Sequence, residues 1–352
     1  MGESVPNHFA SGTTPHRRRP RYSGKYPRRF AEKYKEHDPA RYADTVAKVQ
    51  ASGKTAAGTH RPVMLNEVLD VLSPKPGEIV VDCTLGFGGH AREILSRIQP
   101  GGLVLGLDAD PFELPKTIER LRAAGFGDAV FQGIRSNFAG LSKVLASLNI
   151  EAVDAVFADL GVSSMQLDNP QRGFSFKFEG PLDMRMNPQR GQSASDVIKQ
   201  ISEEALAELL AENADEPHAR SVARALAGTR FETTSALGKA IRNALPHHAK
   251  EDRDNSLRRV FQALRIAVND EFGALNALLR ALPGVLKAGG RAVLLSFHSG
   301  EDRRIKKAFE AGLRAGIYSD IAREVVRPTA AERHANPRSA PAKLRWAIRA
   351  AR

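Results

Sequence analysis

From residue 60 onward, short β-branched runs alternate with amphipathic stretches. The apolar runs predict five buried strands, over residues 79–81, 103–108, 129–132, 153–159 and 291–297. The stretches between them predict helices over 63–72, from 91, over 113–124 and over 137–148. Strands that alternate with helices across short connections indicate a parallel α/β sheet of the doubly wound kind.

The alternation stops at the end of the fourth predicted strand. Residues 160–186 are rich in Gly, Pro, Ser and Asp and follow no sustained helix or strand period, which favours a functional loop. Residues 194–250 are then helical, and we expect Ser195-Asp196 to cap one helix and Thr233-Thr234 to cap another. These helices predict a helical insertion within the α/β domain.

Beyond the insertion, a long helix is expected over 256–282, with a break near Gly273. Two further candidate strands lie at 321–326 and 343–348. We therefore expect three parts: a basic and disordered N-terminal extension, an α/β domain in two segments, and a helical insertion that recognises the substrate. The extension is predicted over 1–58, the α/β domain over 59–168 and 253–352, and the insertion over 169–252.

The composition indicates an intracellular protein with a polyanionic partner. The 352 residues are 42% hydrophobic, which is ordinary for a soluble globular protein. We find no apolar run as long as a membrane span and no apolar core of a signal peptide, so we expect no membrane contact and a cytoplasmic location. Cys83 is the only cysteine, so no internal disulfide can form. The net charge of +12 suggests nucleic acid as the partner.

The N-terminal extension carries much of this charge. Residues 1–58 hold twelve Lys and Arg against five Asp and Glu, which is +7 of the total. The cations are interleaved with Tyr22, Tyr26 and Phe30. Cations bind phosphates and aromatic rings stack on unpaired bases, so the extension could bind RNA. The alternative is a solvated tail without a specific role.

A glycine-rich turn follows the first predicted strand. Gly86, Gly88 and Gly89 fall within four residues and precede a helix, as in nucleotide-binding units of doubly wound folds. Asp82 ends the strand, where a carboxylate would repel a pyrophosphate but would suit the ammonium group of S-adenosylmethionine. The alternative for Asp82 is a structural cap. Asp108 ends the second strand and is placed to bind ribose hydroxyls, which both NAD and S-adenosylmethionine carry.

Several motifs together resemble one enzyme family. They are DLGVSSMQLD at 159–168, RGFSF at 172–176, GPLDMRM at 180–186, HRPV at 60–63, DCTLGFGGH at 82–90, FQALRI at 261–266 with VN at 268–269, SFHS at 296–299 with EDR at 301–303, NPRS at 336–339 and KLR at 343–345. In this order they resemble the bacterial 16S rRNA (cytosine-N4)-methyltransferases of the MraW/RsmH type. The chain departs from that pattern at Cys83, Met165 and Gly300, where Ala, Pro and Leu are usual.

The resemblance implies an activity and its partners. It implies a class I S-adenosylmethionine-dependent methyltransferase fold, Rossmann-like and doubly wound, with an inserted helical domain. It implies methylation of the exocyclic N4 of a cytidine in the decoding region of 16S rRNA, in the small ribosomal subunit. The cofactor would be S-adenosylmethionine. A homodimer is left open.

The resemblance also assigns residues. It places cofactor binding at Gly88, Gly89, His90, Asp108, Phe138, Asp159 and Gln166, to which the turn adds Asp82 and Gly86. Phe138 would lie against the adenine ring. The cytosine amine is a poor nucleophile, so an acceptor near N4 should turn its lone pair toward the methyl group. The polar candidates for this role are Asp159, Ser163, Ser164 and Asp183. The alternatives are loop and cap bonding for the two serines and an ion pair with Arg185 for Asp183.

The single thiol separates two kinds of cytosine methylation. Methylation at C5 needs a cysteine that attacks the ring, yet Cys83 lies beside Asp82 in the cofactor turn. We expect it to pack as a small apolar residue, which favours N4 chemistry. The ten histidines show no metal-ligand spacing, so we expect no metal site.

Two other functions compete with this one. An NAD-dependent oxidoreductase would share the glycine turn and Asp108, but Asp82 and the basic balance count against it. A non-catalytic rRNA-binding or assembly factor would keep the fold without activity. The intact glycine turn, Asp108 and Asp159 argue against that loss.

Overall fold

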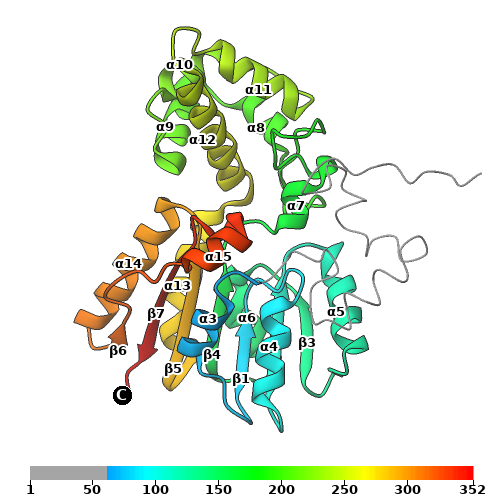
Figure 1. The fold of residues 1–352 in the computed structure, drawn as a ribbon, viewed down its shortest axis with the longest axis vertical. Helices are drawn as coiled ribbons and strands as arrows, with labels where there is room; N and C mark the ends of the chain where they lie inside the picture. Colours follow the sequence, from blue (N-terminus) through cyan, green and yellow to red (C-terminus); the bar gives the residue numbers. More distant parts are fainter. Residues whose placement is uncertain (1–61, 352) are drawn as a thin grey trace, which may run out of the picture.

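The computed structural model describes residues 62–351 and is centred on a seven-stranded sheet (Figure 1). The strands are β1 (Ile79–Asp82), β2 (Leu103–Asp108), β3 (Phe131–Arg135), β4 (Val153–Asp159), β5 (Leu286–Ser296), β6 (Tyr318–Ile321) and β7 (Lys343–Arg349), in the order β3-β2-β1-β4-β5-β7-β6. The first five in this order are parallel, whereas β7 is antiparallel to both neighbours. The doubly wound α/β fold is confirmed, and the predictions for residues 1–58 lie outside the described residues.

The strand order reverses direction beside β1. The chain moves outward from β1 through β2 to β3 and then returns to place β4 on the other side of β1. Asp82, the last residue of β1, therefore pairs with Gly106 of β2 and with Phe157 of β4. Ligands of doubly wound folds bind in the crevice at such a reversal, outside the carboxyl ends of the strands.

Alternating side chains of the strands enter two cores, one on each face of the sheet. Val80 is fully buried in the core that α3 (Leu65–Leu72), α4 (Gly89–Ile98) and α5 (Glu113–Ala123) cover. Val81 is fully buried in the opposite core, under α6 (Leu141–Ser147), α13 (Glu271–Val285) and α14 (Ser299–Arg314). β-branched residues buried on both faces are typical of parallel strands.

A third core lies in a separate group of helices above the sheet (Figure 1). The group consists of α8 (Ala194–Gln200), α9 (Glu203–Ala214), α10 (Ala219–Leu226), α11 (Thr234–Asn243) and α12 (Lys250–Asn269). Leu210, Leu226, Ile241 and Leu257 are fully buried between these helices. We call this group the helical unit. The division of the chain at residue 252 stays a prediction, and α12 contributes buried residues to this core as far as Leu264.

One predicted helix cap was wrong. Ser193 caps α8 by accepting a hydrogen bond from the Asp196 N–H, whereas Ser195 is buried within the helix. The predicted break of the long helix near Gly273 is confirmed, and it lies at Asp270, which adopts a left-handed conformation and accepts the Gly273 N–H with its carboxylate. Thr233 caps α11 as predicted.

Two strands and the loop after β4 also differ from prediction. The third strand starts at Phe131, because the Val130 N–H closes a turn on the Gly127 carbonyl. The sixth strand covers Tyr318–Ile321 and not 321–326, and Tyr318 is anchored against the Phe309 ring. The predicted irregular loop contains a short helix, α7 (Ser164–Asp168), and a 3₁₀ turn, Pro170–Arg172.

The C-terminal segment completes the sheet and covers one end of the crevice. After β6, α15 (Ala330–Ala335) and the 3₁₀ turn Pro337–Ser339 lead into β7, which pairs with β5. Asn336, Pro337 and Arg338 of this segment line the cavity described below. None of the helices within residues 62–351 has both the length and the apolar character that crossing a bilayer requires.

Candidate active site

A cavity of about 760 Å³ lies at the carboxyl ends of the strands, between the sheet and the helical unit. It is lined by the β1–α4 turn, the ends of β2 and β4, α7, and the facing parts of α12 and α13. Of the residues predicted from sequence, Gly86, Gly89, His90, Asp108, Phe138, Asp159, Ser163, Ser164 and Gln166 line it. The other three predicted residues, Asp82, Gly88 and Asp183, lie near the cavity but do not line it.

Two glycines of the turn have no room for a side chain. Gly88 has φ +81°, and a Cβ there would lie 2.9 Å from Thr117 Cγ2. A Cβ on Gly89 would lie 2.7 Å from Cγ of Pro62. Glycine at these positions therefore lets the turn pack against α5 and Pro62. The turn is also fixed to the second strand, because the Gly86 N–H donates to Asp108 Oδ2 at 2.8 Å.

Two carboxyls behind and beside the turn have raised pKa values. Asp82 is 1% exposed and accepts the Thr84 N–H at 3.0 Å; burial, with Asp108 nearby, raises its pKa to about 7. Burial also raises the pKa of Asp108 to about 6, despite hydrogen bonds from the N–H groups of Gly86 and Asp110. Neither carboxyl has a cationic side chain among the groups that shift its pKa. A ligand that brings positive charge or hydroxyl donors would relieve this cost.

A third acid, Asp110, is fully paired. It accepts hydrogen bonds from Arg172 Nη1 at 2.6 Å and from Gln166 Nε2 at 3.0 Å. Burial alone would raise the pKa of Asp110, but the Arg172 guanidinium and these hydrogen bonds hold it below its usual value. Arg172 also donates to the Met186 carbonyl. Asp110 thus joins the second strand to α7 and to the following loop, a role that sequence reasoning missed.

His90 and Asp159 face each other across the turn. His90 Nε2 lies 3.0 Å from the Val63 carbonyl, and burial lowers the pKa of this imidazole to about 4. A carbonyl oxygen can only accept, so Nε2 carries the hydrogen and Nδ1 faces Asp159 Oδ2 at 4.0 Å. Burial, with Asp82 and Glu301 nearby, raises the pKa of Asp159 to about 8. Asp159 Oδ1 is buried and has no hydrogen-bond partner among the described residues.

The polar candidates in the loop differ in their hydrogen-bond partners and in whether they line the cavity. Ser163 and Gln166 form a capping box at the start of α7, which is the cap bonding that the sequence left open. Asp183 forms a two-pronged ion pair with Arg185, at 2.6 and 2.9 Å, outside the cavity lining. This geometry favours the ion pair over the catalytic role that we expected for Asp183. Ser164 lies in the cavity lining.

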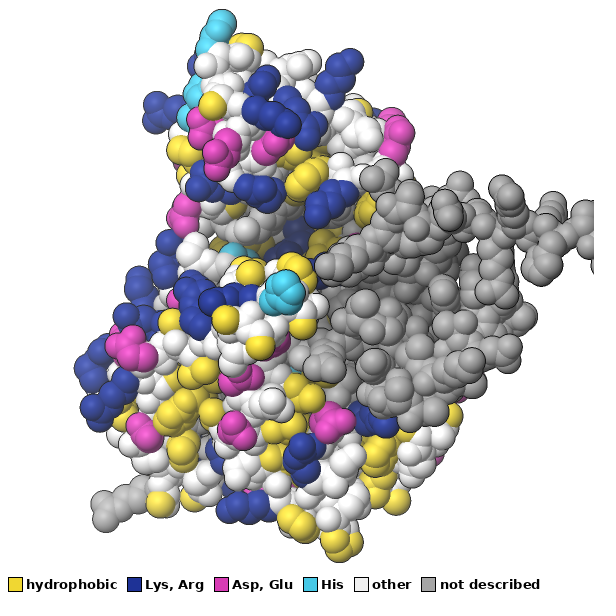
Figure 2. All heavy atoms as spheres, viewed as in Figure 1, with side chains coloured by type: hydrophobic (Ala, Val, Ile, Leu, Met, Phe, Trp, Pro, Cys, Tyr) yellow, Lys and Arg dark blue, Asp and Glu magenta, His cyan; other side chains and the backbone are white. Residues whose placement is uncertain are grey.

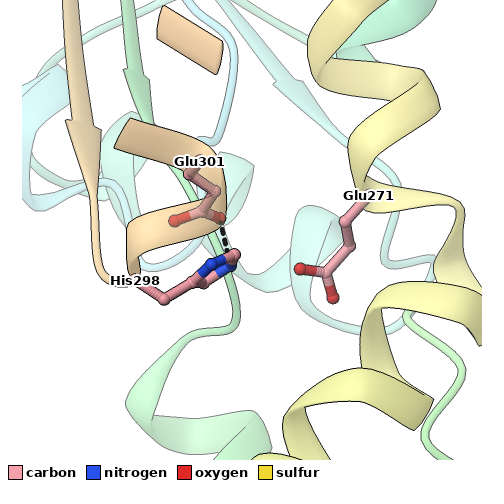
Figure 3. Close-up of side chains that lie close together, drawn as sticks. All are labelled: Glu271, His298 and Glu301. Atoms are coloured by element: carbon pink, nitrogen blue, oxygen red, sulfur yellow. Dashed lines mark ion pairs between the residues drawn. The ribbon is translucent and has the colours of Figure 1, made fainter. Parts of the chain in front are cut away.

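A second polar wall, missed as a candidate site from the sequence, lies in the same cavity. Arg265 of α12 donates to both oxygens of Glu271 at 2.8 Å each. Glu301 at the start of α14 accepts the Phe297 N–H at 2.9 Å, and its Oε1 lies 3.3 Å from His298 Nε2. Arg265, Glu271 and Glu301 line the cavity. Figure 3 shows the Glu271 and Glu301 carboxylates on either side of the His298 ring.

Glu271, His298 and Glu301 also have metal-type ligand atoms within 4.8 Å of one another. Sequence spacing could not show this group, because its members come from two distant segments. However, Arg265 already neutralises Glu271, and Glu301 is stabilised by His298, Arg265 and the Phe297 N–H. Both carboxylates of the group thus already have protein partners.

The departure at Gly300 has a structural reason. A Cβ on Gly300 would lie 2.6 Å from Cζ of Phe272, so a larger residue there would displace this ring. The Arg304 guanidinium lies over the other part of the ring, at 3.5 Å from its centroid. Gly300, Phe272 and Arg304 thus pack α13 against α14 beside the second wall.

Basic side chains gather on one face of the helical unit and of the sheet domain (Figure 2), and one of them, Arg258, lines the cavity. Figure 2 shows Lys and Arg gathered on the helical unit and along the edge of the sheet domain, with a hollow between them. The exposed ones include Arg220, Arg224, Arg258, Arg303, Lys306 and Lys307. Such a surface fits a polyanionic ligand that reaches the cavity from outside.

Comparison with known proteins agrees with these features. The model of the MraW methylase family matches residues 57–350. Ribosomal RNA small subunit methyltransferase H 1 of Agathobacter rectalis is 46% identical over 344 residues, covering 95% of this chain and 98% of that protein. Ribosomal RNA small subunit methyltransferase H 2 of Alkaliphilus metalliredigens is 47% identical over 342 residues, covering 95% and 97%. A solved rRNA methylase from Streptococcus thermophilus, at 12% identity over 81% of this chain and 93% of that one, has a TM-score of only 0.38.

Proposed function

Because this chain belongs to the MraW methylase family, a family of S-adenosylmethionine-dependent methyltransferases, we propose that it methylates N4 of a cytidine in the decoding region of small-subunit rRNA. The relatives described above are named as methyltransferases of small-subunit rRNA. The observation that best supports the proposal is the buried, unpartnered Oδ1 of Asp159, at the end of β4 in the cavity. We further propose that the enzyme acts in the cytoplasm.

The residues present fit S-adenosylmethionine. When bound, it supplies a methyl group on a positively charged sulfur. The glycine turn would hold the part of the cofactor that faces the protein backbone. This part would be surrounded by Gly86, Gly88, Gly89 and His90. Asp82 would balance its ammonium charge, and the Asp108 carboxylate would accept from the ribose hydroxyls. Phe138, at the cavity rim, would lie against the adenine, and Gln166 would complete the pocket from α7.

The side chains near Asp159 would orient the amine of the target base. Asp159 would accept an N4 hydrogen, which turns the nitrogen lone pair toward the methyl group. Ser164, in the lining beside it, would be a further polar contact, whereas Ser163 is occupied by the α7 cap. We propose that the insertion predicted over 169–252, which includes α8 to α11 of the helical unit, recognises the RNA around the target. Its exposed arginines would bind phosphates.

The thiol in the cavity does not suit C5 chemistry. Cys83 is 2% exposed, and burial, with Asp82 beside it, raises the pKa of this thiol well above its ordinary value. The thiolate, not the thiol, is the nucleophile, so Cys83 is unsuited to attack a ring carbon. This supports N4 as the methylated atom.

The test is nucleoside mass spectrometry on small subunits. Subunits from cells that lack this protein are incubated with the full chain and isotope-labelled S-adenosylmethionine. We expect one labelled N4-methylcytidine per subunit, in a decoding-region fragment. A C5-methylated product would contradict the N4 assignment, and absence of any labelled nucleoside would contradict the function.

The N-terminal extension provides a second test. The two relatives cover 95% of this chain although the family match starts at residue 57, so they align with part of the segment before it. We propose that this basic segment binds rRNA. Removing residues 1–58 should leave cofactor affinity unchanged, weaken subunit binding about tenfold and make its salt dependence shallower, because fewer counterions are released. Equal affinity and equal salt slope for both proteins would contradict this role.

A further inference from the structure

We propose that Glu301 and Arg265 bind the Watson–Crick edge of the target cytosine, and that Glu301 is the residue that takes the N4 proton during methyl transfer. This inference rests on the proposed function and deepens it, because it assigns the substrate side of the site. Both side chains line the cavity that also contains Asp159. They come from helices α14 and α12, and sequence reasoning gave neither of them a role in catalysis.

Glu301 is held as a carboxylate close to Asp159. It is 3% exposed, and burial would raise its pKa, but His298, Arg265 and the Phe297 N–H hold that pKa below its usual value. Its charge is near enough to Asp159 to help raise the pKa of that carboxyl. Two like charges in one buried site do not both ionise readily, so one member keeps a proton. In the free enzyme Asp159 keeps the proton and Glu301 is the ready acceptor.

Arg265 offers donors at the same place. Its Nε and Nη2 each donate one hydrogen to Glu271, and the Arg265 guanidinium makes no further hydrogen bond within residues 62–351. A guanidinium has five N–H donors, so three are left. Its Nη2 lies 3.8 Å from the position of a Cβ on Gly161, in the loop that directly follows Asp159. Glu271 therefore fixes the guanidinium plane with free donors beside that loop.

This arrangement matches cytosine and opposes uracil. The Watson–Crick edge of cytosine presents the N4 amine as donor and N3 and O2 as acceptors. Carboxylates facing N4 and a guanidinium facing N3 and O2 would satisfy all three. Uracil presents O4 to the carboxylates and an N3–H to the guanidinium, so both contacts become repulsive. Unpaired or repelling buried polar groups give the strong discrimination that such a site needs.

The bonds and protons of the methyl-transfer step balance with S-adenosylmethionine as methyl donor and Glu301 as proton acceptor. The N4 lone pair forms the new N–C bond while the S–CH₃ bond of S-adenosylmethionine breaks and its electron pair stays on sulfur. The nitrogen then carries an extra proton, which Glu301 accepts to give neutral N4-methylcytosine and a neutral glutamic acid. Solvent removes this proton after product release. General-base assistance of this kind typically contributes about 10²- to 10⁴-fold in rate.

His298 is a positioning residue in this arrangement. Its ring packs against Phe272, with centroids 5.8 Å apart, and its Nε2 faces Glu301 Oε1 (Figure 3). Its side chain is 9% exposed, and His298 is not among the residues that line the cavity. It acts on the base only through Glu301, by keeping that carboxylate turned toward the cavity.

The test compares two glutamate-to-glutamine changes in the same helix. Glu301→Gln keeps the side-chain shape and an acceptor for the Phe297 N–H, and it should lower the single-turnover methylation rate on small subunits about 100-fold or more. The dissociation constant of S-adenosylmethionine should stay within about threefold of wild type, since no cofactor contact changes. Glu310→Gln, which removes a surface carboxylate paired with Lys306, should leave both values unchanged. A Glu301→Gln rate within threefold of wild type would overturn the proposal.

A change in the RNA tests Arg265 without depending on a folded variant. Small subunits are reconstituted with 3-deazacytidine at the target, which replaces the N3 acceptor by C–H. Wild type should methylate them at least tenfold more slowly, and Arg265→Lys should discriminate much less. Equal rates of wild type on both subunits would contradict the Arg265 contact. If wild type methylates neither, the proposed function itself fails.

A metal-binding measurement addresses the other chemistry of this cluster. Wild type stripped with a chelator is titrated with Mn²⁺ alone and followed by electron paramagnetic resonance. We expect no stoichiometric binding, because the carboxylates are already compensated. Stoichiometric Mn²⁺ binding that Glu301→Gln abolishes would assign the cluster to a metal and overturn the base-binding role.

Discussion

The two walls of the cavity differ in whether the protein provides partners for the charge of their buried carboxyl groups. The cofactor wall consists of the turn over residues 82–90 with Asp108 and Asp159, and Asp82 lies behind its surface. The base wall consists of Arg265, Glu271 and Glu301, with His298 behind them. Burial raises the pKa of all three acids of the cofactor wall, and no cationic side chain within residues 62–351 offsets this rise. In the base wall, Glu271 is paired with Arg265, and Glu301 has a lowered pKa. One wall thus awaits a positively charged ligand, and the other is already balanced.

Removing an acid from each wall should therefore affect stability in different ways. Glu271→Ala leaves the Arg265 guanidinium unpaired in a largely buried position and should lower the free energy of unfolding by about 3 kcal/mol. Asp82→Asn removes a buried carboxyl without a cationic partner and should leave that free energy unchanged or raise it. Chemical denaturation measures both, with Glu93→Ala at an exposed ion pair as the near-neutral control. Equal losses for Glu271→Ala and Asp82→Asn would contradict the comparison.

Asp108 tests the cofactor wall directly. Asp108→Ala should weaken S-adenosylmethionine binding by about 1–3 kcal/mol, since buried ribose hydroxyls would lose their acceptor. Titration calorimetry measures this change. Asp128→Ala, at an exposed carboxylate beyond α5, is the matched control and should have no effect. Unchanged cofactor affinity in Asp108→Ala would refute the assignment of the ribose site.

The pH dependence of cofactor binding should reveal the raised pKa values of the cofactor wall. Asp82 and Asp159 have pKa values of about 7 and about 8 in the free protein, so they are largely protonated at pH 6. A cationic ligand favours their ionised forms, so binding releases protons and affinity rises with pH. We expect about a tenfold gain in S-adenosylmethionine affinity between pH 6 and 8. Calorimetry in buffers of different ionisation enthalpy counts the protons.

The product S-adenosylhomocysteine serves as the control ligand, because its sulfur is uncharged. Its affinity should rise less steeply over the same pH range. Asp82→Asn should flatten the curves for both ligands, because both carry the ammonium group that Asp82 is proposed to balance. Parallel curves for both ligands would show that the sulfonium charge is not what the cofactor wall compensates.

The smallest effect is expected at Cys83. Cys83→Ala removes a buried thiol that packs in the core under the sheet, and it should cost about 1 kcal/mol of stability. Methylation activity should be largely retained, because the thiol takes no part in N4 chemistry. Loss of all activity in a folded Cys83→Ala protein, measured by labelled methyl transfer, would contradict the N4 assignment.

The same contrast explains how far the sequence could predict the site. The cofactor wall is contiguous: a β-branched strand, three glycines and a second strand that ends in an acid are readable as a pattern. The base wall joins positions on α12, α13 and α14 that are up to 36 residues apart and that no periodicity connects. The resemblance included Arg265 and Glu301 in its motifs, but only the fold shows that they face the same cavity.

Helices and strands could likewise be predicted where their signal is contiguous in the sequence. Strands with buried β-branched runs, such as 153–159, were predicted to the residue. Boundaries that depend on one side-chain contact were not, as at Asp270, where the carboxylate accepts the Gly273 N–H and starts a new helix. The Ser163–Gln166 capping box was visible in the sequence as Ser-x-x-Gln, and it would have predicted α7.

The described chain begins inside the site. Pro62 and Val63 line the cavity, Pro62 lies against Gly89, and the Val63 carbonyl accepts the His90 hydrogen bond. The basic segment over 1–58, which we propose binds rRNA, therefore joins the described chain within a few residues of this cavity. A phosphate bound twelve residues before Pro62 can lie at most about 43 Å from it, given the reach of an extended chain. An RNA held by this segment would be kept at a high local concentration around the cavity, so that engaging the target base becomes a nearly intramolecular event.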